Sequence, residues 1–155
     1  MPEKDEFVLE AGRLKITFHW KVDRFEHRIS AGNETRRAAT KPEYLAPVFT
    51  EVHQQGELLF LSGHGPGCHW SASVEAEEQA FLFDVACRAG KEVGEIGSGY
   101  VGDGLLVEPA KDVGAIVLPG AQEVAGAPAW SIKPVASWSG FPGTLRYGYR
   151  ISAGG

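Results

Sequence analysis

Apolar and polar residues alternate along residues 13–31, which read RLKITFHWKVDRFEHRISA. A period of two is typical of a β-strand with one buried face. A turn at Val22-Asp23 would form a hairpin that pairs Leu14 with Ala31, Ile16 with Ile29, Phe18 with His27, and Trp20 with Phe25. A slip of one residue would mix the two faces, so the pattern predicts this register. Val-Asp is not a favoured two-residue turn, and a wider loop also fits.

A second hairpin is predicted from VFTEVH and ELLFLSG, which flank Gln54-Gln55-Gly56. Residues 58–61 are apolar on both faces, which predicts a strand covered on both sides. Residues 32–47 are polar and contain proline, so we expect a connection with at most a short helical turn at residues 43–46.

After Gly90 the sequence is rich in glycine and proline. GEIGSGYVGDG is typical of a loop, whereas VGAIVLPG, AWSIKPVASW and TLRYGYRIS are typical of strands. RFEHRISAG at 24–32 recurs as RYGYRISAG at 146–154. This echo fits either a duplicated β-unit or two strands with similar surroundings.

The central segment, SVEAEEQAFLFDVACRAG, fits two structures. Its Glu, Ala and Gln residues favour a helix, and Gly90 stands where a helix cap belongs. The alternative is a hairpin with a turn at Glu77-Glu78, which we favour because it places every large apolar residue except Leu82 on one face. Its register pairs Val74 with Phe81, Ala72 with Phe83, Trp70 with Val85, and Cys68 with Cys87.

HWSASVE followed by FLFDVACR resembles a motif pair in an uncharacterised bacterial family of small β-rich proteins. The resemblance covers the larger, N-terminal part of the chain and implies a β-rich fold with a central hairpin. No activity or ligand is assigned to that family, so the resemblance implies no function.

These segments predict an all-β fold, in which residues 1–155 form a single domain. We expect an antiparallel β-barrel or a flattened β-sandwich built from hairpins. A chain of 155 residues is long enough to bury a core of its own.

The net charge of −5 argues against nucleic acid and anionic membranes as partners, because both require a basic face. The N-terminus lacks a basic segment followed by an apolar one, and no apolar run approaches the ~20 residues of a membrane span. We therefore expect a soluble, cytoplasmic protein in which Cys68 and Cys87 are buried thiols in contact, with a disulfide as the alternative under oxidising conditions. The sequence does not specify an oligomeric state.

The stretch SGHGPGCHWSAS at residues 62–73 contains His64, Cys68 and His69, which with His53 are residue types that bind zinc. Neighbouring residues of a strand point to opposite faces, so Cys68 and His69 would not share an ion. The sequence therefore predicts no metal site.

Catalytic and cofactor motifs are also not predicted. The central hairpin would place Ser71 opposite Asp84, with His69 two residues away on the same face. Side chains at i and i+2 of a strand lie roughly 6–7 Å apart, too far for the hydrogen bond between a nucleophile and its base. Residues 97–102 match G-x-G-x-x-G but lack the flanking strand and helix of a dinucleotide site. We expect no catalytic residue and no cofactor.

The predicted inner face gathers aromatic residues around one histidine, and we take it as a candidate ligand-binding site: Trp20, Phe25, His27, Trp70 and Phe83. A histidine in such surroundings is either a hydrogen-bonded core residue or the polar group that orients a small ligand. The leading hypothesis is a non-enzymatic binding module for a small apolar or amphipathic ligand.

Two alternative functions come from other features of the sequence. A protein-interaction or assembly module would use edge strands and exposed aromatics such as Trp138 or Phe141. A His-dependent hydrolase or metalloprotein would use His64 or His69.

Overall fold

The computed structural model describes residues 4–31, 34–39, 45–101, 105–118, 123–124 and 127–153. Within these ranges the regular elements are all β-strands, which confirms the prediction of an all-β fold. No helix in the described part of the chain is long and apolar enough to cross a membrane. The strands are β1 (Glu6–Ala11), β2 (Leu14–Lys21), β3 (Arg24–Ala31), β4 (Glu34–Ala39), β5 (Glu51–Gln55), β6 (Leu58–Gly65), β7 (Cys68–Glu77), β8 (Ala80–Ala89), β9 (Ser98–Val101), β10 (Leu105–Pro109), β11 (Ile116–Leu118), β12 (Glu123–Val124), β13 (Ala127–Lys133) and β14 (Gly143–Ala153).

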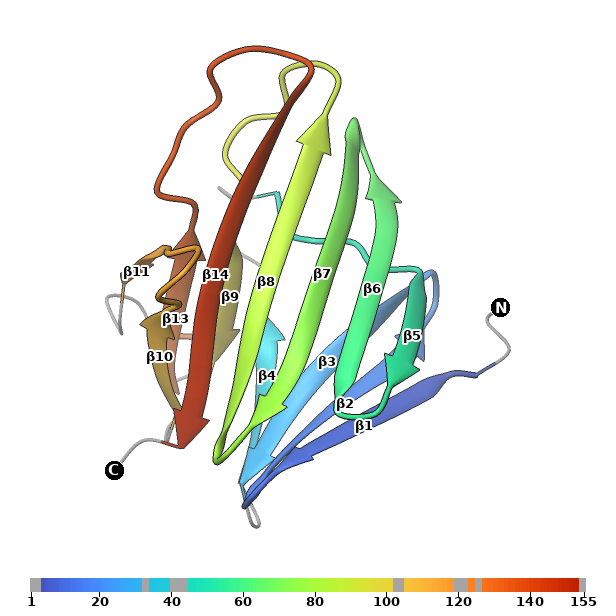
Figure 1. Ribbon diagram of the computed structural model, residues 1–155, viewed down its shortest axis with the longest axis vertical. Helices are drawn as coiled ribbons and strands as arrows, with labels where there is room; N and C mark the ends of the chain where they lie inside the picture. Colours follow the sequence, from blue (N-terminus) through green and yellow to red (C-terminus); the bar gives the residue numbers. More distant parts are fainter. Residues whose placement is uncertain are drawn as a thin grey trace.

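The strands form two antiparallel sheets that lie face to face (Figure 1). The first sheet has the order β1-β2-β3-β4-β9-β13-β11, with β12 paired to β13, and the second has the order β10-β14-β8-β7-β6-β5. Neither sheet closes on itself within the described residues. The chain is therefore the flattened sandwich of the two predicted architectures, and not the barrel.

The first predicted hairpin is confirmed in every pair. In β2 and β3, Leu14 lies opposite Ala31, Ile16 opposite Ile29, Phe18 opposite His27, and Trp20 opposite Phe25. The turn is the tight Val22-Asp23 pair and not a wider loop, and Val22 adopts a φ of 64° to make it. The two-residue turn is allowed because that left-handed conformation matches the twist of the paired strands.

The prediction for the second hairpin is wrong in its turn and its exposure. The turn is Gly56-Glu57, with Gln55 opposite Leu58, because Gly56 supplies the positive φ of 62° that a tight turn requires. Leu59 and Leu61 are buried, but Phe60 points away from the core and is 43% exposed. β6 is thus covered on one face only, because no other strand of the described residues packs against its outer face.

Two segments predicted as connections form strands. β4 lies within residues 32–47 and pairs with both β3 and β9, and β9 crosses the Gly-rich stretch after Gly94. Backbone hydrogen bonds on both sides hold these short strands in spite of a sequence that favours turns. Residues 43 and 44 of the predicted helical turn lie outside the described residues.

The central segment forms a hairpin, as we favoured, but its register differs from the predicted one by two residues. The turn is Glu78-Gln79, and Trp70 lies opposite Cys87 while Cys68 lies opposite Ala89. A shift of two leaves every side chain on its predicted face. In the observed register all five inward positions of β7, from Cys68 to Ala76, find partners from Ala89 to Phe81. The predicted register would have left Ala89 without a partner on β7.

The core lies between the sheets and is built from the inward-facing residues of both. Ile16, Phe18 and Ile29 of the first sheet are buried with Trp70, Phe83 and Ile151 of the second in one apolar cluster. Alternation along each strand produces this arrangement, because one side of every strand faces the opposite sheet.

A short segment before β5 ties the two sheets together at one side. Phe49 accepts a hydrogen bond at its carbonyl from the N–H of Phe25 in the first sheet, and the N–H of Thr50 donates to Ser62 in the second. Gly63 lies directly beneath this segment: a Cβ atom there would be 2.2 Å from the carbonyl oxygen of Val48. Only glycine permits so close an approach of two backbones.

Substituting Gly63→Ala should therefore lower the free energy of unfolding by about 1–3 kcal/mol, as overpacking of a rigid site does. Gly90→Ala is the matched control, because a Cβ at Gly90 has nothing within 4 Å. Urea unfolding of both variants measures the difference. Equal stability of the two variants would contradict the role of Gly63.

Candidate functional site

The five predicted ligand-binding residues lie on the inner face, in two groups and one isolated position. Trp20 contacts Phe25 with ring centroids 5.2 Å apart, and His27 faces Phe83 at 5.8 Å. Trp70 is fully buried and lies two inward positions before Val74 in β7, where Val74 is the partner of Phe83. A ligand site on the inner face stays a prediction.

His27 belongs to a polar chain that crosses the space between the sheets. Its Nε2 atom lies 2.8 Å from the hydroxyl of Tyr100, which lies 2.8 Å from the hydroxyl of Tyr149. His27 and Tyr100 belong to the first sheet and Tyr149 to the second. A parallel link joins the Ser98 hydroxyl to that of Tyr147 over 2.7 Å. These contacts satisfy polar groups that burial would otherwise leave without partners.

Burial shifts the titration of this chain away from neutral pH. Loss of hydration lowers the pKa of His27 to about 4, with a smaller contribution from His19. Burial also raises the pKa of Tyr100, Tyr147 and Tyr149. All four groups are therefore neutral near pH 7, as a hydrogen-bonded core requires.

The depressed pKa of His27 makes stability depend on pH. The unfolded chain binds a proton at His27 below pH 6.5, whereas the folded chain does so only near pH 4. The free energy of unfolding therefore includes the full contribution of neutral His27 above pH 6.5. It falls by up to about 3 kcal/mol as the pH decreases from 6.5 to about 4. Urea unfolding between pH 7 and pH 4 should show a smaller loss for His27→Gln than for the wild type.

The control for this measurement is His53→Gln, which changes an exposed histidine on β5. The free energy of unfolding of this variant should depend on pH as that of the wild type does. A His27→Gln variant with the same loss between pH 6.5 and pH 4 would contradict the assignment.

Tyr100 should contribute more to stability than Tyr147, although both are fully buried. Tyr100→Phe removes two hydrogen bonds and leaves His27 and Tyr149 without that partner, so we expect a loss of about 2–4 kcal/mol. Tyr147→Phe removes the bond to Ser98 alone, for about 1–2 kcal/mol. Denaturant unfolding compares them, and equal losses would contradict the central position of Tyr100.

In the SGHGPGCHWSAS stretch, Cys68 and Trp70 point inward and His69 points outward, as predicted. The two thiols are not directly opposed, but burial and a hydrogen bond with Cys68 raise the pKa of Cys87. Both are free cysteines. No group of three or more metal-binding side chains is found in the described part of the chain.

The observed register also separates Ser71 from Asp84, which the predicted hairpin would have placed opposite each other. Ser71 lies opposite Ala86, and Asp84 lies opposite Ser73 and binds Arg146.

The candidate interaction aromatics lie together in the loop before β14: the rings of Trp138 and Phe141 are 5.2 Å apart. The indole of Trp138 donates to the carbonyl of Gly94 over 2.9 Å, so this residue anchors the loop. Phe141 is 37% exposed.

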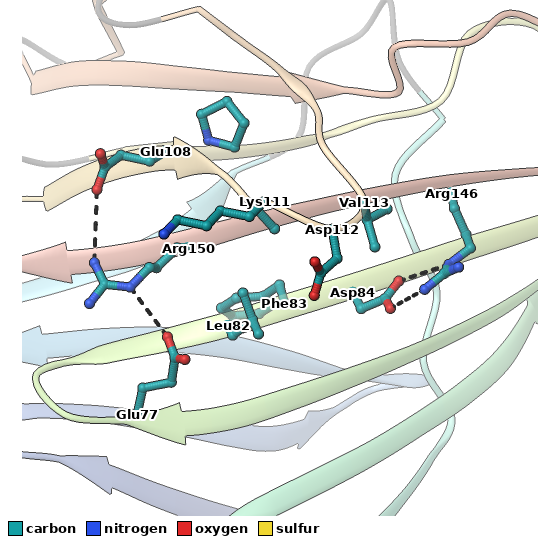
Figure 2. Close-up of a pocket in the computed structure, with 12 residues that line it drawn as sticks. Glu77, Leu82, Phe83, Asp84, Glu108, Lys111, Asp112, Val113, Arg146 and Arg150 are labelled. Carbon is teal, nitrogen blue, oxygen red and sulfur yellow. Dashed lines mark hydrogen bonds and ion pairs between the residues drawn. The ribbon is translucent and has the colours of Figure 1, made fainter.

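A pocket of about 690 Å³ lies on the outer face of the second sheet, where β8 and β14 meet the loop after β10 (Figure 2). This size is typical of small-molecule sites, which span about 300–1,000 Å³. Its apolar lining comes from Leu82, Pro109, Ala110 and Val113, and Phe83, whose ring is in the core, also borders it. Its charged lining comes from Glu77, Asp84, Glu108, Lys111, Asp112, Arg146 and Arg150.

Gly148 explains why the loop can cover the sheet at this point. Along the outer face of β14 it stands between Arg146 and Arg150, and it exchanges backbone hydrogen bonds with Ala110 and Gly114. A Cβ atom at Gly148 would be 2.9 Å from the Cβ of Val113. The loop at residues 110–114 therefore packs into the gap that the missing side chain leaves.

The charges of the pocket are partly paired. Arg146 binds Asp84 through two hydrogen bonds, and this contact raises the pKa of Arg146. Arg150 donates to Glu77 over 3.2 Å and lies 3.8 Å from Glu108. Lys111 and Asp112 have no ion-pair partner among the residues that the structure describes.

The sequence reasoning missed this pocket, because its residues come from strands that are distant in the chain. One signal was present: a glycine within the strand pattern RYGYRIS indicates a close approach by another backbone.

Comparison of the chain with protein-family models, curated proteins and solved structures finds no match.

Proposed function

We propose that the protein is a binding module for a small amphipathic ligand that carries both a positive and a negative charge. The pocket over Gly148 is the site of binding. The observation that carries the proposal lies on the loop that covers an otherwise charge-paired pocket: Lys111 and Asp112 form no ion pair with any residue in the described ranges.

The two loop charges face different parts of the pocket. In Figure 2 Lys111 extends in the direction of Arg150, and the Asp112 carboxylate lies toward Asp84. The carboxylate of a zwitterion would pair with Lys111, and its ammonium group would pair with Asp112. A ligand with a single charge would satisfy one of these residues and leave the other in contact with solvent.

The apolar residues favour a ligand with an apolar body between its charges. Leu82 lies on the floor of the pocket and Val113 on the loop, and both are partly buried. Covering such surface contributes about 25 cal/mol per Å². Short peptides with apolar side chains combine this body with a free amine and a free carboxylate, and they are the ligand class that we propose.

Isothermal titration with short apolar peptides tests the proposal. The unmodified peptides should bind, whereas the N-acetylated and the C-amidated forms should bind at least about tenfold more weakly, since each lacks one charge. Asp112→Asn should abolish the preference for the free amine, and Lys111→Met the preference for the free carboxylate. Salt should weaken the binding, because both residues are exposed.

The matched controls are Lys91→Met and Glu92→Gln, which change an adjacent, exposed cation and anion outside the pocket. They should bind like the wild type. Absence of binding by every unmodified peptide would overturn the proposal, as would equal binding by the acetylated and amidated forms.

A further inference from the structure

The strand pairing brings two exposed histidines together at the tip of the β6–β7 hairpin. The turn is Pro66-Gly67, and His64 lies directly opposite His69 in the ladder. The ring centroids are 4.5 Å apart, and Nδ1 of His69 lies 3.4 Å and 3.3 Å from the two ring nitrogens of His64. The sequence alone does not specify this pairing, because it depends on a two-residue turn and on the register of β6 and β7.

The separation of the nitrogens matches the requirement of a tetrahedral metal ion. With zinc–nitrogen distances of about 2.0–2.1 Å, two ligands of a tetrahedral ion lie about 3.3–3.4 Å apart. Two adjacent ligands of a square-planar ion lie closer, at about 2.9 Å. Both side chains are exposed, so small rotations can direct one nitrogen of each toward a shared ion.

The backbone beneath the pair is held in place from the core side. Gly63 is pressed against the segment at Val48, and Trp70 is fully buried. These residues flank His64 and His69 in their strands, so the two histidines are fixed at the spacing of a directly opposed pair. A site on a rigid ladder loses little conformational entropy when it binds an ion.

We propose that His64 and His69 together bind a zinc ion through one nitrogen each. No third metal-binding side chain accompanies them among the described residues, so the remaining coordination positions are open to water or to an anion. Arg88 is the partner of His69 on β8 and is exposed. Its positive charge opposes a bare cation and attracts an anion, so the site binds zinc most tightly together with a carboxylate.

Zinc titration of tag-free, chelator-treated protein by calorimetry tests this site. The wild type should bind one equivalent, and His64→Ala and His69→Ala should each weaken binding at least about tenfold, because the loss even of an outer-shell partner commonly costs that much. His53→Ala removes another exposed histidine from the same sheet face and should leave the affinity unchanged. Acetate should increase the affinity of the wild type, and Arg88→Gln should reduce that increase.

Cobalt(II) provides a second measurement, which reports the coordination geometry of the bound ion as well as its binding. Its visible absorption should show the intense bands of four-coordinate cobalt in the wild type and lose them in either single variant. Circular dichroism verifies that the variants fold. An unchanged zinc affinity in either His64→Ala or His69→Ala, weakened binding in His53→Ala, or no binding by the folded wild type would overturn the proposal.

Discussion

The Tyr100 hydroxyl is the centre of a buried hydrogen-bonded chain that adds a directional contact to the apolar packing of the two sheets. It bonds to His27 within its own sheet and to Tyr149 in the opposite one. Apolar packing is non-directional and tolerates sliding, whereas a hydrogen bond of 2.8 Å does not. The buried chain therefore specifies how the sheets lie on each other. The echoed segments meet here, because His27 and Tyr149 occupy matching positions of RFEHRISAG and RYGYRISAG.

Local alternation was enough to predict the hairpins, and its limits explain the errors. The β2–β3 register follows from the sequence because Phe18, His27 and their neighbours have one favourable alignment. In the β7–β8 hairpin, alignments that differ by two residues keep the same faces, so the pattern did not distinguish them. The position of Ala89 and the conformation of Gln79 decided between them. Strands β4 and β9 form because they pair with each other across the sheet. They are distant in the chain, so the local sequence does not indicate this pairing.

Both proposed sites depend on neighbours across strands. The pocket exists because Gly148 in β14 accommodates a loop that follows β10, and the histidine pair exists because a two-residue turn brings His64 beside His69. Each residue type was visible in the sequence. Their proximity follows from registers and from a loop contact, and these are the features that single-sequence reasoning specifies least well.

The buried thiols have a consequence for how the protein can be observed. Cys87 is inaccessible and Cys68 nearly so, and burial keeps Cys87 from forming the reactive thiolate. A thiol reagent therefore reaches these side chains when the sandwich opens, and not before. The rate at which the native protein consumes such a reagent therefore measures how often the sandwich opens, and no added label is required.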